Sequence, residues 1–307
     1  MAYTGTGTEA DPYVVTTLTD ILALEGDDIH IKIGADIDAS QEEAFKEPRT
    51  SAIRLRGHIY ADEMRTIANV IVETGYMIDI SGGGSRYPVH VENIFFKNWI
   101  HRKTGSAATI VLSYGSCNNC CFSLEMLDSA YGYKLLAKSG TYGSDPNVTN
   151  CAFYVKFTSG TVRRHTSTNY SMLENIVAKN CTFQFEKLFV GSSAITFNAS
   201  TAPLTNCTFV GDMSVDVGET TSLQLFKGTT TKVIFALAVT IAEESTGESL
   251  DISFISSDSS YPVTYVMVDS DILGENVTVT LSSSTNYSLT TEQMKSEQYL
   301  TDIGFLP

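Results

Sequence analysis

Two groups of residues in this sequence have types and spacing that could carry chemistry. Asp36 and Asp38 are two positions apart in a strand-like stretch, so their carboxylates share a face, as the paired acids of a glycoside hydrolase require. Arg163, Arg164 and His165 form a compact basic cluster, and they could serve as a lyase base, contact a glycan or dock on an acidic partner. The two aspartates fall in the first repeat of the chain, where a structural role is simpler, and a basic cluster in a polar loop is ordinarily solvated. We therefore assign no catalytic residue.

The cysteines and histidines are the candidate metal ligands. Cys117 and Cys120 have the spacing of a zinc or redox motif, but a second such pair is absent and no histidine is close in sequence. Three of the other cysteines recur inside a repeat, which favours a role as small buried hydrophobic residues. The histidines at positions 30, 58, 90 and 101 look scattered, without the spacing of a ligand set. The sequence thus predicts no metal and no cofactor.

Aromatic side chains outside the repeat are the remaining candidates for binding. Tyr131 and Tyr133 could stack on carbohydrate or anchor a protein partner, since a tyrosine ring is apolar and its hydroxyl is polar. Together with Arg163, Arg164 and His165, they are the predicted glycan- or partner-binding residues.

The elements that position these residues come from an internal repeat. Five segments of the form Asn-apolar-x-Phe align without gaps, and their asparagines recur at steps of about 30 residues. Such a period is typical of solenoids. The predicted ladder consists of Asn93, Asn119, Asn150, Asn180 and Asn206, with Phe96, Phe122, Phe153, Phe183 and Phe209.

The residues within each repeat alternate as in a strand. Cys151 and Phe153 point to one face and Ala152 to the other, so we expect the cysteine and the phenylalanine to face inward. The asparagine precedes the strand, where it tolerates a left-handed backbone and can hydrogen-bond to its equivalent one coil away. The equivalent residues should stack about 4.8 Å apart from coil to coil.

The repeat length determines the fold class. A coil of about 30 residues fits three short strands with their turns, which predicts an all-β protein, a single right-handed parallel β-helix. We place the β-helix at residues 28–285, an N-terminal cap at 1–27 and a C-terminal cap at 286–307. Short helices near residues 19–25, starting at Thr19, and near residues 289–295 would close the two ends.

The composition restricts the possible partners. The 307 residues include 20 basic and 35 acidic side chains, a net charge of −15. Such a chain is repelled by phosphate backbones and anionic lipids, so we expect neither nucleic acid nor a membrane as partner. The start of the chain has no basic segment followed by an apolar one, so no signal peptide is expected.

Both ends of the chain resemble those of a known family. The opening Gly5-Thr-Gly-Thr-Glu-Ala-Asp-Pro-Tyr-Val-Val15, the strand Ile31-Lys-Ile-Gly-Ala-Asp-Ile-Asp38 and the ending Leu289-Thr-Thr-Glu-Gln-Met-Lys295 look like those of pectate-lyase-like β-helix proteins of phage virions and gut-bacterial surfaces. The resemblance, which includes the repeat between the ends, is specific for architecture and only suggestive for function.

The resemblance, with no signal peptide expected, implies a non-enzymatic structural protein of a phage virion, a fibre, spike or decoration protein made in the host cytoplasm. Its expected partners are other virion proteins, further copies of itself in a homotrimer or symmetric array, and a host polysaccharide. Two alternatives stay open: a polysaccharide lyase or hydrolase, and a bacterial surface adhesin.

Overall fold

The computed structural model describes residues 3–24, 26, 28–81, 89–102, 108–127, 134–137, 147–158, 172–191, 197–218, 222–254, 263–281, 286–303 and 305. These residues form two compact units, unit 1 with residues Met1–Thr161 and unit 2 with residues Val162–Pro307. Each unit is described by itself below.

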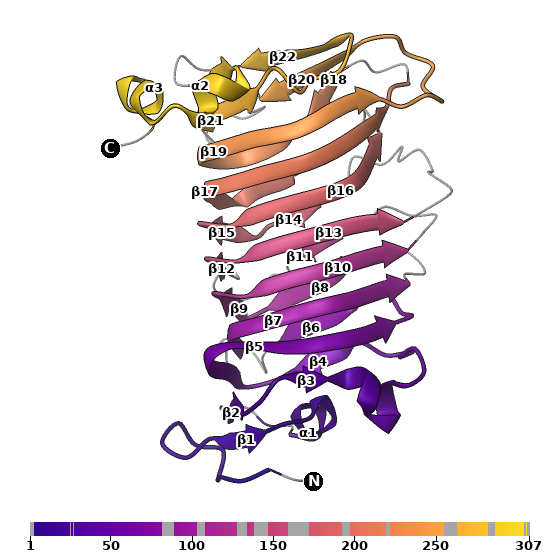
Figure 1. Ribbon diagram of the computed structural model, residues 1–307, viewed down its shortest axis with the longest axis vertical. Helices are drawn as coiled ribbons and strands as arrows, with labels where there is room; N and C mark the ends of the chain where they lie inside the picture. Colours follow the sequence, from indigo (N-terminus) through magenta and orange to yellow (C-terminus); the bar gives the residue numbers. More distant parts are fainter. Residues whose placement is uncertain are drawn as a thin grey trace. The chain divides into compact units, whose positions relative to one another are not determined.

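Unit 1 is a parallel β-solenoid whose coils contribute strands to three faces (Figure 1). The first face consists of β1 (Tyr13–Val15), β2 (His30–Ile33), the start of β5 (His58–Val72), the start of β7 (Val89–Arg102), β9 (Gly115–Asn118) and β12 (Asn147–Thr149). The second face consists of β3 (Ile37–Asp38), the later parts of β5 and β7, β10 (Cys121–Leu127) and β13 (Ala152–Thr158). The third face consists of β4 (Ile53–Leu55), β6 (Ile78–Ser81), β8 (Ala108–Ser113) and β11 (Lys134–Ala137).

The interior of unit 1 contains a stack of aromatic rings. Phe122 pairs with Phe96 on one neighbouring strand and with Phe153 on the other, and all three side chains are fully buried. The ring centroids are 4.7 and 4.8 Å apart, with interplanar angles of 10° and 4°. In-register parallel strands place equivalent side chains directly above one another, and therefore the repeated phenylalanine becomes a continuous stack.

Asparagines form the bends that precede these strands. Asn93, Asn119 and Asn150 have φ angles of 59°, 49° and 54°, in the left-handed region. The Asn119 side-chain amide donates to the Asn93 side-chain oxygen at 2.7 Å. The amide of Asn150 instead donates to the side-chain oxygen of Asn118 at 3.2 Å, one residue before Asn119.

A second asparagine ladder, which the sequence did not reveal, lies on the second face. Asn69 and Asn98 also have left-handed φ angles, 63° and 56°. Asn98 donates its amide to the oxygen of Asn69 at 2.7 Å, and Asn69 donates to Oδ1 of Asp38 at 2.8 Å. Asp38 therefore ends this ladder.

The N-terminal end of unit 1 is covered by α1 (Leu18–Ala23), followed by two 3-10 helices at Ala39–Gln41 and Glu43–Phe45. Helix α1 buries Leu18 and Ile21. Its N-cap is Thr17, whose hydroxyl accepts from the backbone N–H of Asp20, so the expected start at Thr19 is wrong by two residues.

Unit 2 is also built from parallel strands (Figure 1). One set consists of β14 (Leu173–Glu174), β15 (Val177–Lys179), β16 (Thr182–Gly191), β17 (Phe197–Asp216), β19 (Phe226–Ile241), β21 (Val263–Asp269) and β23 (Tyr287–Leu289). A separate three-stranded parallel sheet consists of β18 (Ser222–Gln224), β20 (Leu250–Phe254) and β22 (Val277–Leu281).

The same interior pattern recurs in unit 2. Phe183, Phe209 and Phe235 are in register on β16, β17 and β19, and the rings of Phe183 and Phe209 are 5.0 Å apart. Asn206 donates its amide to the oxygen of Asn180 at 2.8 Å.

Two short helices, α2 (Thr291–Lys295) and α3 (Glu297–Asp302), end the chain. Helix α2 begins with a capping box formed by Thr290 and Gln293. Leu300 of α3 and Phe305 pack against Met267 and Leu289. The predicted class, an all-β parallel β-helix with few short helices, is confirmed. Within the described residues, no helix has the length and apolar character needed to cross a membrane.

Candidate functional site

A cleft of about 880 Å³ lies in unit 1 beside the third face. We call it the arginine cleft, because Arg49, Arg54 and Arg56 all line it. The other lining residues are Leu22, Leu24, Gly26, Thr50, Ser51, Ala52, Thr74 and Tyr76. They come from the end of α1, from the segment before β4 and from the connection between β5 and β6.

Strand alternation positions the first of these cations. In β4, Ile53 and Leu55 are buried and Arg54 between them is exposed, because successive side chains of a strand point to opposite faces. Arg54 pairs in the ladder with Asp79 of β6. Arg56 directly follows the strand, two residues after Arg54, so its side chain points to the same side as that of Arg54.

A single carboxylate separates two of the guanidinium groups. Arg54 Nε is 3.7 Å and Arg56 Nη2 is 3.8 Å from the same Asp79 Oδ2. The Arg54 side chain is 71% exposed, and Arg56 is 30% exposed. Ion pairs at this separation are weak. The cleft thus brings three arginines together in a chain of net charge −15.

Arg49 is fixed by its backbone and by a ring. Its N–H donates to the carbonyl of Ile71 at 2.8 Å, which ties this segment to β5. Its guanidinium lies 5.2 Å from the centroid of the Phe45 ring, and Nη2 donates to Ser51 Oγ at 3.2 Å. This cation is thus positioned before any ligand arrives.

The lining of the cleft suits an anionic ligand with an apolar surface. Guanidinium groups bind carboxylate, sulfate or phosphate groups in a planar, two-pronged manner. Leu22, Leu24 and Tyr76 supply apolar and aromatic surface next to them. A sugar acid combines these two properties.

A second cluster lies on the first face of unit 1, where three histidines stack. His30 pairs with His58, and His58 pairs with His90, on three successive coils. The rings of His30 and His58 are 4.5 Å apart at 14°, and those of His58 and His90 are 5.0 Å apart at 29°. We call His30, His58 and His90 the histidine column.

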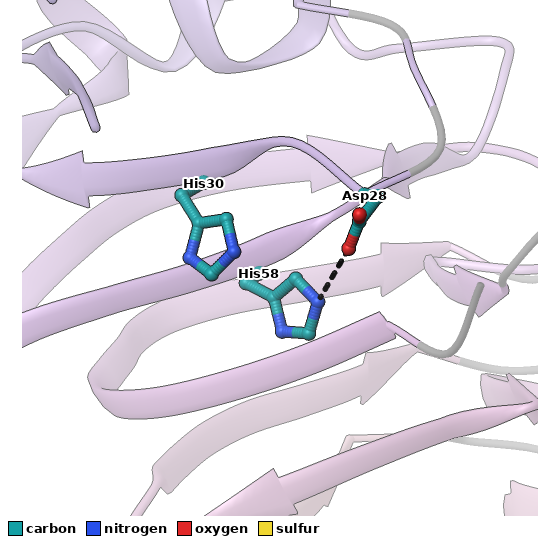
Figure 2. A group of neighbouring side chains, drawn as sticks. All are labelled: Asp28, His30 and His58. Carbon is teal, nitrogen blue, oxygen red and sulfur yellow. Dashed lines mark ion pairs between the residues drawn. The ribbon is translucent and has the colours of Figure 1, made fainter. Parts of the chain in front are cut away.

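Asp28 joins the column at its N-terminal end. It has a left-handed φ of 65°, and its Oδ1 lies 3.7 Å from Nε2 of His58. One ligand atom each from Asp28, His30 and His58 lies within 4.8 Å of the other two (Figure 2). Within the described residues, this is the group of side chains that could hold a metal ion.

Burial favours the neutral imidazole at His58 and His90. Burial lowers the pKa of His58 below its usual value, and the nearby imidazoles of His30 and His90 lower it further, against the effects of Asp28 and Glu9. Burial also lowers the pKa of His90. His90 Nδ1 is within hydrogen-bond distance of Ser116 Oγ, at 2.5 Å. A neutral imidazole has a free lone pair on one nitrogen, which can bind a metal or accept a proton.

The predicted binding residues lie outside the described part of the chain. These are Tyr131, Tyr133, Arg163, Arg164 and His165. The aspartate pair is described and is held by structural hydrogen bonds. Asp36 Oδ1 accepts from the backbone N–H of Thr66 at 2.9 Å, and Asp38 ends the second asparagine ladder.

The cysteines are thiols rather than disulfides, and five of the six are buried. Cys120 donates to the carbonyls of Val91 and Asn118, and burial raises the pKa of its thiol well above the usual value. Protonated, buried thiols are poor nucleophiles and poor metal ligands. His101 is also fully buried, with its two ring nitrogens near Thr109 Oγ1 and the Thr74 carbonyl.

Sequence reasoning missed both clusters. The interpretation of the histidines as scattered is wrong for three of them, because His30, His58 and His90 recur at steps of about 30 residues, one coil each. That match to the repeat length was the available signal. No protein-family model, no curated protein and no solved structure matches this chain.

Proposed function

We propose that this chain is a non-enzymatic structural protein of a phage particle, and that its arginine cleft binds an anionic group of a host-surface glycan. The observation that carries the binding part is the gathering of Arg49, Arg54 and Arg56 in one cleft of an acidic chain. The particle location rests on the resemblance of the two chain ends and the repeat to virion β-helix proteins.

The solenoid suits such a role because its interior is closely packed. Stacked rings such as Phe96, Phe122 and Phe153 and the hydrogen-bonded asparagine bends fix each coil on the next. A support of this kind holds the cleft in shape while the particle meets a cell, so little binding free energy is lost to ordering the site.

The particle location has a direct test. Particles purified from the phage that encodes the chain are analysed by quantitative mass spectrometry. We expect this protein in a fixed copy number relative to the major capsid protein. If it is missing from purified particles, or if its amount varies between preparations, the virion assignment is wrong.

The binding role is tested with acidic and neutral glycans. Isothermal titration calorimetry should show binding of uronate-containing or sulfated oligosaccharides and no binding of uncharged ones of the same length. Arg54→Gln and Arg56→Gln should each weaken binding by about tenfold or more, since a hydrogen bond to a charged group contributes roughly 1.5–3 kcal/mol. Arg102→Gln is the matched control, because Arg102 lies outside the cleft lining and its Nη1 is 2.7 Å from Glu73.

The same arginines are also compatible with one alternative function, that of a polysaccharide lyase. A polysaccharide lyase uses an arginine or lysine as its base, and Arg54 and Arg56 lie beside a carboxylate, Asp79. Incubating the protein with an acidic polysaccharide and measuring the chain length separates the two functions. Unchanged chains support binding alone, whereas shortened chains with unsaturated ends would establish cleavage and overturn the non-enzymatic proposal.

A further inference from the structure

The histidine column offers a second site, on another face of the solenoid from the cleft. It is created by register, because the strand starts of β2 and β5 pair His30 directly with His58. Neighbouring parallel strands lie about 4.8 Å apart, so the two paired, outward-facing rings are in contact. The observed separation of the ring centroids is 4.5 Å.

Asp28 completes a three-residue group. It lies two residues before His30 and has a left-handed backbone. Its carboxylate Oδ1 lies 3.7 Å from Nε2 of His58. Figure 2 shows the Asp28 carboxylate directed toward the ring of His58, with the His30 ring beside it. One ligand atom from each of the three side chains lies within 4.8 Å of the other two.

We propose that Asp28, His30 and His58 bind one divalent transition-metal ion of the Zn²⁺ type on the outward face of unit 1. Two imidazole nitrogens and one carboxylate oxygen are a donor set that suits Zn²⁺, Ni²⁺, Co²⁺ and Cu²⁺. Ca²⁺ and Mg²⁺ prefer oxygen ligands throughout, so this group discriminates against them. Three protein ligands leave a coordination position open to water or to an external ligand.

The side chains can reach the required geometry without moving the core. Ligands of a tetrahedral Zn²⁺ ion at 2.0–2.1 Å are about 3.3 Å apart, so the three atoms must close in from their present spread. The stacked rings direct their lone pairs side by side, and one ring has to tilt. The Asp28 side chain is 74% exposed and has room to rotate toward the rings, whereas His58 is 24% exposed and lies between the rings of His30 and His90.

His90 provides a matched control. It is the next member of the column, it is also outward, and its ring stacks on His58. Its Nδ1 is already engaged near Ser116 Oγ, and it lies outside the three-residue group. His90→Gln therefore perturbs the column without removing a proposed ligand.

The experiment is calorimetric titration of ZnCl₂ into the full-length protein after treatment with a chelator, followed by the same titration with CaCl₂. We expect one Zn²⁺ bound per chain and no comparable Ca²⁺ binding. Asp28→Asn, His30→Gln and His58→Gln should each lower Zn²⁺ affinity by about tenfold or more, because even residues that only support a ligand cost roughly 10- to 100-fold. His90→Gln should stay within about twofold of the parent.

A second measurement separates loss of binding from loss of folding. Zn²⁺ at a concentration that saturates the parent should raise the thermal unfolding midpoint of the parent and of His90→Gln clearly more than that of His30→Gln or His58→Gln, with unchanged circular dichroism spectra for all four. The proposal is wrong if the parent binds no Zn²⁺. It is equally wrong if the His30 and His58 variants bind as the parent does, which would place the ion on thiols or other carboxylates. An effect of His90→Gln equal to that of His58→Gln would overturn the three-residue assignment.

Discussion

The side-chain amide of Asn119 donates a hydrogen bond to the side-chain oxygen of Asn93 at 2.7 Å, although the two residues are 26 positions apart. Both have left-handed backbones, with φ of 49° and 59°. Each asparagine thus does two things at its bend: it adopts a conformation that most residues avoid, and it joins its coil to the next one.

Two variants of Asn119 should separate these roles. Asn119→Gly keeps the left-handed conformation and loses only the amide, whereas Asn119→Ala loses the amide and also strains the backbone. We expect the alanine variant to be less stable than the glycine variant by about 1 kcal/mol, measured as the free energy of unfolding in urea. Equal stabilities of the alanine and glycine variants would show that a side chain at position 119 does not strain the backbone of the bend.

The aromatic stack should dominate the stability of unit 1. Phe122 is fully buried between Phe96 and Phe153, so Phe122→Ala should lower the free energy of unfolding by about 3–5 kcal/mol. Tyr154→Ala is the control, since Tyr154 is an aromatic residue of the adjoining strand that is 42% exposed, and it should change stability by about 0.5 kcal/mol or less. A Phe122 effect as small as that of Tyr154 would contradict the packing described here.

The thiols should differ in reactivity. Cys121 is half-buried, and burial raises its pKa, whereas the other five cysteines are buried. Iodoacetamide at pH 8 should therefore modify the native protein slowly and at one position only, because the thiolate is the reacting form. Intact mass spectrometry should show no native modification of Cys121→Ser and modification of every remaining thiol after unfolding in urea. Rapid modification of several native thiols would disprove their burial.

Asp38 should titrate at low pH because of its place on the second ladder. The hydrogen bond from Asn69 lowers its pKa below 3.8, with a further contribution from Ser40. A carboxylate whose folded pKa is depressed stabilises the fold above its unfolded pKa, and this contribution is lost as the pH falls through the folded value. Asn69→Gly, which keeps the left-handed backbone and loses only the amide, should therefore raise the pKa of Asp38, measured by NMR titration.

Asn98→Gly is the matched control for that titration. Asn98 donates to Asn69 and not to Asp38, so its loss should leave the pKa of Asp38 nearly unchanged. Equal shifts in both variants would mean that the ladder acts through its backbone rather than through the one hydrogen bond to Asp38.

The architecture could be predicted from the sequence because its signals repeat. Phe122 and Asn119 have equivalents one coil away, and a residue that faces the interior has to satisfy the same packing in every coil. The histidine column carried the same signal, because its members lie one coil apart in the sequence, but ligand sets are usually sought at short spacing.

Other features depend on contacts that no local pattern specifies. Arg49, Arg54 and Arg56 meet in a cleft because a segment without regular structure packs beside β4. Thr17 and Thr19 are equally good N-caps by type, and the structure selects Thr17 because the Thr19 hydroxyl is bonded to the distant carboxylate of Glu42. Such choices are made by tertiary packing, which one sequence does not display.

The in-register pairing of the coils has a genetic consequence. Each coil begins and ends at equivalent bends. Duplicating or deleting the stretch of the gene that encodes one whole coil would therefore lengthen or shorten the solenoid by one strand spacing and leave every remaining bend intact. The insertion or deletion of one residue within β10 would instead shift the strand by one position, so that its later side chains would exchange the inward and outward faces. Insertions and deletions in this protein should therefore be tolerated when they comprise a whole coil and not when they comprise a single residue. The length of the solenoid can then evolve independently of the residues that line its cleft and its histidine column.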